Sequence, residues 1–184
     1  MYTKHLGLPV ITLALLLSGC GKVEEKATEK AAEAAIESAM NQNGAKDAKV
    51  DLSNNGISAT VTDANGKQQK IELNNAKISE QETGVPFYPG ATQVEGASSR
   101  VTTAEGGAVT TTLSTADALE KVAAFYSPQI KKIGAGKQVL ESSEGGTQTW
   151  MINSSNGNAS ETVMVQAKRN GEATEITIHT TRTK

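Results

Sequence analysis

The stretch Ser114–Gly134, STADALEKVAAFYSPQIKKIG, carries the clearest structural signal in the sequence. Its apolar residues recur three or four positions apart and therefore share one side of an α-helix; they are Leu119, Val122, Ala123, Tyr126, Ile130 and Ile133. Ser114 resembles a helix N-cap with Asp117 three residues later, and Gly134 is a typical stop. Pro128 either kinks this helix or starts a second one. The stretch predicts an amphipathic helix that buries its apolar stripe against another element.

Short segments of alternating apolar and polar residues lie on both sides of this helix and predict strands. Their separators are pairs such as Gly106-Gly107 and Asn170-Gly171, which favour tight turns. The segments are Thr92–Thr103, Ala108–Leu113, Lys137–Ser142, Thr147–Asn153, Ser160–Arg169 and Ala173–Thr181. One helix laid on an antiparallel sheet buries both patterns at once. We therefore predict an α+β domain over residues 92–184, an antiparallel sheet packed by one amphipathic helix.

The region between residues 20 and 91 predicts smaller elements that precede this domain. Residues 20–46 are rich in Ala, Glu and Lys, which favour a tether helix, with a coiled-coil interaction helix as the alternative. Residues 47–78 contain three short alternating segments around Asn-Gly turns and predict a small three-stranded β meander. Residues 79–91 are expected to form a linker that ends in the sequence Tyr-Pro-Gly-Ala.

The first nineteen residues predict a targeting segment. Lys4 precedes an apolar run, Leu8–Leu17, which at about ten residues is too short to span a bilayer and fits a cleaved signal peptide. The run ends in Leu-Ser-Gly-Cys, which resembles the lipobox of bacterial lipoproteins. That resemblance implies cleavage between Gly19 and Cys20 and a diacylglycerol thioether on the Cys20 sulfur. It also explains the one cysteine in the sequence.

A lipid on Cys20 implies a membrane-anchored protein of the cell envelope. Two or three acyl chains hold a protein firmly, since each buried CH₂ contributes ~0.8 kcal/mol. In lipoproteins of double-membrane bacteria, Asp after the cysteine favours retention in the inner membrane, and this sequence has Gly21 there. By that resemblance, we expect the inner leaflet of the outer membrane, with the domain facing the periplasm.

Two further motifs resemble a family of uncharacterised bacterial envelope lipoproteins. The first is Pro-Phe-Tyr-Pro-Gly-Ala at residues 86–91, and the second is Val-Ala-Ala-Phe-Tyr at residues 122–126. The stretch Ala48–Leu73, with its Asp-Ala-Asn-Gly-Lys turn, resembles the small β module that precedes the domain in that family. The resemblance implies fold and location. It implies no activity, because none is assigned to the family.

Composition and motif content argue against several classes of function. The net charge of −2 and the interspersed signs give no basic surface for nucleic acid. His179 is the one histidine after the signal peptide, so we predict no metal site, no cofactor and no catalytic triad. Residues 63–66 weakly resemble a calcium-binding loop, and we interpret them as a turn. Trp150 is the one residue that we consider as part of a ligand groove.

Three functions remain open from the sequence. We expect a non-enzymatic, lipid-anchored domain that binds another envelope component, either a protein or a lipid. The alternative is a small-molecule or lipid-binding module with a cavity between sheet and helix. A weaker alternative is an enzyme that uses carboxylates. A flat sheet with an exposed apolar patch favours the first, and buried, paired carboxylates favour the third.

Overall fold

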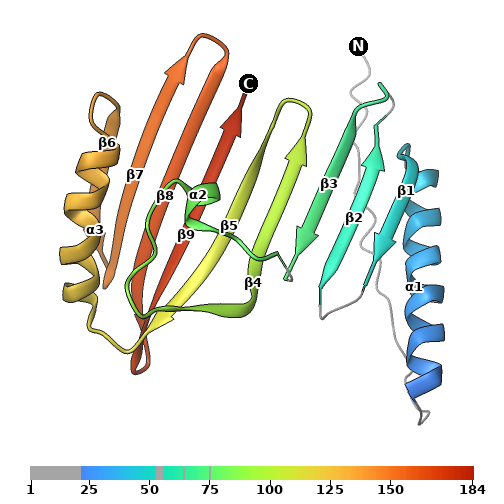
Figure 1. Ribbon diagram of the computed structural model, residues 1–184, viewed down its shortest axis with the longest axis horizontal. Coiled ribbons are helices and arrows are strands. Elements are labelled where there is room, and N and C mark those ends of the chain that lie inside the picture. The colour runs from blue at the N-terminus through green and yellow to red at the C-terminus, as the bar shows by residue number, and fades with distance from the viewer. Residues whose placement is uncertain (1–21, 53–55, 64, 75) are drawn as a thin grey trace, which may run out of the picture.

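The computed structural model describes residues 22–52, 56–63, 65–74 and 76–184 (Figure 1). The predicted signal peptide and Cys20 lie outside these residues. The described chain forms one antiparallel sheet of nine strands with three helices, so the predicted mixed α+β class is confirmed. The strand order is β1-β2-β3-β4-β5-β9-β8-β7-β6, which places the last strand in the middle of the sheet.

The strands follow the alternating segments of the sequence closely. Their bounds are β1 (Lys46–Asp51), β2 (Ile57–Thr62), β3 (Gln68–Leu73), β4 (Thr92–Thr103), β5 (Gly106–Thr115), β6 (Gln138–Glu144), β7 (Thr147–Asn156), β8 (Ala159–Asn170) and β9 (Ala173–Thr183). The first three strands form the predicted meander. They continue into the same sheet as the others, because Ile71 of β3 pairs with Val101 of β4.

The main core lies between helix α3 (Leu119–Ile133) and the strands β5, β9, β8 and β7. Val122, Tyr126 and Ile130 supply the helix side and are at most 1% exposed. They belong to one cluster with residues that alternate along the strands, which are Leu113, Trp150, Ile152, Val163, Val165, Ala167, Ile176 and Ile178. The stripe that predicts the helix is therefore the stripe that meets the sheet.

The start of α3 differs from the prediction. The helix begins at Leu119, and its N-cap is Ala118, without a capping side-chain hydrogen bond. Ser114 is still part of β5, where it pairs with Glu175 of β9. Sheet pairing outweighs the local capping signal at this position. Pro128 lies inside the continuous helix, and the helix ends at Gly134 as predicted.

The motif at residues 86–91 and the motif at residues 122–126 contact each other through their aromatic rings. The ring of Tyr88 packs edge-on against Phe125 at a centroid distance of 5.4 Å. Phe125 packs in the same way on Tyr126, which contacts Trp150. The Tyr88 hydroxyl donates to Asp117 just before α3, over 2.7 Å. The motifs therefore join the segment before β4 to the helix, as their aromatic residues suggest.

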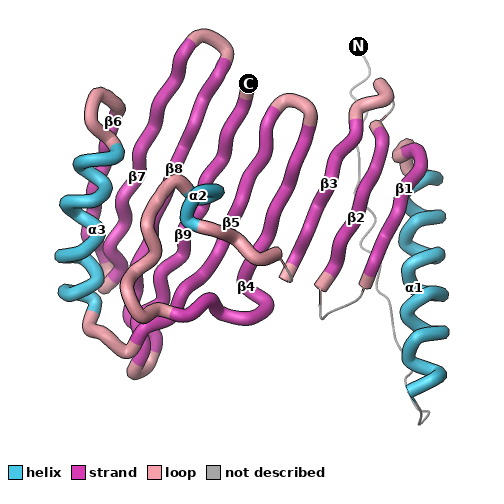
Figure 2. Tube along the Cα trace, in the orientation of Figure 1, coloured by secondary structure: helices cyan, strands magenta, loops and turns pink. Residues whose placement is uncertain are grey.

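A short helix, α2 (Glu80–Thr83), lies in the stretch predicted as a linker. Ser79 and Glu82 form a capping box, and Gly84 ends the helix with a left-handed backbone. The segment crosses the sheet on the side where α3 lies (Figure 2). Thr180 of β9 donates to the carbonyl of Thr83 over 2.7 Å, which fixes α2 on the sheet. The capping box was readable in the sequence, but the flanking residues show no helical period.

Helix α1 (Lys22–Gln42) lies along the outer edge of β1 (Figure 1). Three of its side chains accept hydrogen bonds from alternate backbone amides at this edge. Asn41 accepts from Ala48, Glu37 from Val50 and Glu33 from Leu52, at 3.1, 2.8 and 2.9 Å. The spacing matches, because four helical residues rise about 6.0 Å and two strand residues about 6.8 Å. The helix thus closes an edge that otherwise offers free amides to another strand.

Candidate interaction face

The two faces of the sheet are covered differently. Helices α2 and α3 lie over one face, on β5, β9, β8 and β7. Side chains alternate along a strand, so the residues between the core positions point to the other side. We call that other side, over β2 to β6, the open face. None of the open-face residues named below is buried, whereas Ile176 and Ile178, their neighbours on the covered side, are fully buried.

The strand register arranges the open face in three rows that cross the sheet. The central row is Ile57, Leu73, Ser99, Thr110, His179, Met164, Met151 and Leu140. A second row is Ile71, Val101, Ala108, Thr181, Thr162, Asn153 and Gln138. Ala59 of β2, which pairs with Ile71, is buried, so in this row the open face begins at β3. A third is Thr112, Thr177, Gln166, Thr149 and Ser142.

The three rows contain no Asp, Glu, Lys or Arg, although 21% of the whole chain is charged. The described structure leaves four large apolar side chains exposed, and three of them lie in the central row: Ile57 at 37%, Leu73 at 36% and Leu140 at 52%. The central portions of protein–protein interfaces are depleted of charge in the same way, and methionine is enriched there. In its lack of charge and its two methionines, the open face resembles the centre of an interface.

Hydrogen bonds between neighbouring side chains hold the polar part of these rows. His179 lies between two hydroxyl groups, with Thr110 2.9 Å from Nδ1 and Thr181 3.0 Å from Nε2. Thr112 and Thr177 are 3.2 Å apart, and Thr162 donates to Asn153 over 2.9 Å. Because these polar side chains are already bonded to one another, they are ordered before any partner arrives, which lowers the entropic cost of binding.

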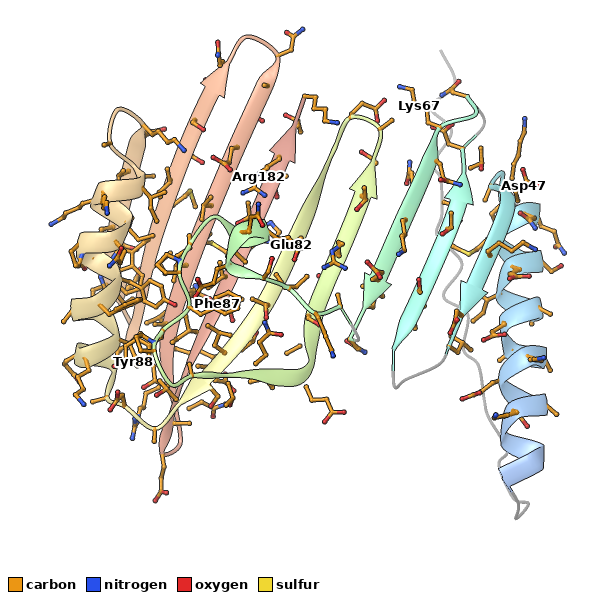
Figure 3. All side chains as sticks on the ribbon, in the orientation of Figure 1. Asp47, Lys67, Glu82, Phe87, Tyr88 and Arg182 are labelled. Atoms are coloured by element: carbon orange, nitrogen blue, oxygen red, sulfur yellow. The ribbon has the colours of Figure 1, made fainter. Side chains whose placement is uncertain are left out.

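The covered side carries a cluster of charged residues instead. Arg100 of β4 donates to Glu72 of β3 over 2.7 Å and to Glu82 of α2 over 2.9 Å. Arg182 donates to the carbonyl of Glu82 and to the carboxylate of Glu161 over 2.6 and 2.7 Å. Glu82 and Arg182 face each other above β9 (Figure 3). The two arginines border a cleft of about 420 Å³ between α2 and the strands β4, β5 and β9.

The carboxyl groups of this cluster are held ionised. Hydrogen bonding to Arg100 lowers the pKa of Glu72 below its ordinary value. At Glu82, burial acts to raise the pKa, but the hydrogen bonds from Ser79 and Arg100 outweigh it, so the pKa is lowered. At Glu161, hydrogen bonds from Arg182 and Lys137 likewise overcome burial. A general acid needs a raised pKa, so the lowered values favour a structural ion-pair role for these carboxylates.

Removing the guanidinium that joins β3, β4 and α2 should destabilise the fold. We expect Arg100→Met to lower the free energy of unfolding at pH 7 by ~1–3 kcal/mol, because Glu72 and Glu82 lose a charged hydrogen-bond donor. Both carboxyl pKa values are lowered in the folded state, so this stabilisation is present above the ordinary carboxyl value and is lost as the pH falls below it. Urea unfolding at pH 7 and pH 3 should therefore show a much smaller difference between variant and wild type at pH 3.

The matched control for Arg100→Met is Lys121→Gln. Its ion pair with Asp117 is on the surface, with the lysine side chain 70% exposed, and such pairs contribute little. Equal urea midpoints for wild type and Arg100→Met at pH 7 would show that the cluster does not support the fold.

The structure places the other residues singled out in the sequence as follows. Trp150 is fully buried, and its indole N–H donates to Ser127 over 3.2 Å, so it has no surface to offer a ligand. Gly19 and Cys20 lie outside the described residues. In the described ranges, no three His, Cys, Asp or Glu residues are grouped closely enough to hold a metal ion. No helix among the described residues is both long and apolar enough to cross a membrane.

Searches of protein-family models, of curated proteins and of solved structures found no match to this chain.

Proposed function

We propose that this protein is a lipid-anchored lipoprotein of the bacterial envelope that binds a protein partner through its open face and catalyses no reaction. The lipid on Cys20 holds the domain at the membrane, on the periplasmic side of the outer membrane. The open face supplies the contact. The observation that carries the proposal is the absence of charge from the three rows of the open face, the longest of which crosses eight strands.

The composition of this face favours a protein partner over a lipid one. A surface that binds anionic headgroups needs Lys or Arg, and these rows contain neither. Flat sheet faces with alternating apolar and hydroxyl side chains pack well against another ordered protein surface. Anchoring raises the effective concentration of the domain at the membrane, so a face of moderate affinity is sufficient.

In-cell photo-crosslinking tests this function directly. A photoreactive amino acid at Thr177, in the third row, should give a crosslinked band that mass spectrometry identifies as an envelope protein. The control position is Gln68, which is exposed on β3 and points to the opposite side of the sheet. We expect at least tenfold less product from Gln68. Equal yields from the two positions, or no protein product from Thr177, would refute the proposal.

A further inference from the structure

The pattern of residues along the open face identifies one partner. We propose that the face binds the same face of a second copy of this chain, forming a two-layer dimer with its two-fold axis parallel to the strands. The inference rests on the proposed function and names the partner of that same surface.

The central row is complementary to its own reversed copy. A two-fold axis parallel to the strands and centred between β5 and β9 reverses the strand order, so β2 faces β6 of the other copy, β3 faces β7, and β4 faces β8. Ile57 then lies opposite Leu140, and Leu73 opposite Met151. These residues form the apolar ends of the row, and all but the half-buried Met151 are exposed. The polar centre also matches, because Thr110 lies opposite His179.

The absence of charge is what permits this self-pairing. Any charged residue on a two-fold interface near the axis meets its own copy, which costs energy through like-charge repulsion. The open rows contain none, whereas the flanking positions of the same side carry Glu175 and Lys168 beyond the third row. The arrangement is that of an isologous interface with an uncharged centre and charged residues along one border.

The size of the face is also that of a stable interface. The central row crosses eight strands, the second seven and the third five, which makes twenty residues. At about 4.8 Å between strands and about 6.8 Å between rows, each residue covers about 33 Å², so each copy contributes roughly 650 Å². Standard protein interfaces bury about 800 Å² per partner. Strand β1 and helix α1, which lies along its edge, are outside the area in which the two copies face each other.

The proposed axis agrees with anchoring in one membrane. A rotation about a line parallel to the strands leaves both copies pointing the same way along that line. Helix α1 runs beside β1, so the first residues of both α1 helices lie at the same end of the dimer (Figure 1). In each copy, α1 begins at Lys22, two residues after Cys20. Both lipids can therefore enter the same leaflet while the open faces remain in contact.

A charge exchange tests the proposed register. In the dimer, Met164 of β8 lies opposite Ser99 of β4 in the other copy, whereas within one chain β5 and β9 separate these two strands. Met164→Lys alone and Ser99→Glu alone should each weaken the dimer by about 100-fold, through an unpaired or repelled charge at the interface. The double variant should recover at least tenfold of the loss, since each lysine then faces a glutamate of its partner. The control is Gln68→Lys, on the opposite side, with no change.

The measurement is the protein mass of the purified full-length lipoprotein in detergent, determined by light scattering over a concentration series. Thermal unfolding followed by circular dichroism establishes that each variant is folded. We expect a dimer for wild type and control, a monomer for each single variant, and a dimer for the double variant. A monomeric wild type, or a dimer unaffected by Met164→Lys and Ser99→Glu, would overturn the proposal. A monomer whose Thr177 crosslinks to a different envelope protein would overturn the dimer and leave the proposed function intact.

Discussion

Cys20→Ser is expected to move the protein from the membrane fraction to the soluble fraction almost completely. Serine cannot form the thioether to diacylglycerol, so the acyl chains are lost together with lipid-dependent processing. Each buried CH₂ of an acyl chain contributes ~0.8 kcal/mol to membrane binding, and nothing else described in the chain replaces it. No described helix is suited to cross a membrane, and the net charge of −2 gives no electrostatic attraction to anionic lipids.

The experiment is fractionation of cells after detergent-free lysis, with mass spectrometry of the protein from each fraction. Ser18→Ala is the matched control, because it keeps a small residue before the cysteine and should leave the protein acylated and membrane-bound. Wild-type protein should carry the mass of two or three acyl chains at Cys20. An intact leader or an unmodified thiol at this position in the wild type would remove the basis for placing the protein in the envelope.

The sequence predicts the strands well because their signal is local. Alternation and Asn-Gly or Gly-Gly turns locate all nine strands, and β4 begins and ends where predicted, at Thr92 and Thr103. The strand order is not local. The Asn170-Gly171 turn indicates that β9 pairs with β8, but nothing near residues 173–183 reveals that its other edge pairs with β5, because that pairing depends on contacts nearly seventy residues apart, as in Thr110 with His179.

The open face was missed for the same reason. The positions facing away from the core, such as Thr177 and His179, look like ordinary exposed strand residues when each strand is considered alone. Their lack of charge becomes significant only when the register places them in rows across the sheet. A count of charges at the outward positions of all strands was available from the sequence and would have found it. Trp150 attracted attention by its type, but a large aromatic ring in a small domain serves the core.

The three hydrogen-bond acceptors on α1 should determine whether the helix stays attached to the edge of β1. Replacing Glu33, Glu37 and Asn41 together by alanine removes the three acceptors of the β1 amides. Each such hydrogen bond has a net value of about 1–1.5 kcal/mol, so the free energy of detaching α1 should fall by ~3–4 kcal/mol. Half-buried side chains of α1 also contact β1, where Ala48 and Val50 are buried, but none of the described side chains of the helix is itself buried.

Amide hydrogen exchange measures the detachment of α1, and sedimentation velocity measures its consequence. Exchange of the β1 amides should accelerate by about 100-fold or more in the triple variant, because local opening then requires less free energy. Once α1 has detached, the exposed edge of β1 should also pair with strand edges of other molecules, in a concentration-dependent way. Adding Met164→Lys to both wild type and triple variant removes the proposed face-to-face contact, so that any remaining association comes from β1.

Lys30→Ala provides the control, because Lys30 is an exposed residue of α1 and is none of the three acceptors. It shortens a side chain of the same helix and leaves Glu33, Glu37 and Asn41 in place, so its exchange rates should equal those of the wild type. If the triple variant also exchanges like the wild type, α1 is held by contacts other than these three bonds. If it exchanges faster but does not associate, the bonds hold the helix in place but are not needed to prevent strand addition at β1. The expected result is faster exchange together with association. It would show that the same three side chains hold α1 on β1 and prevent association through the β1 edge.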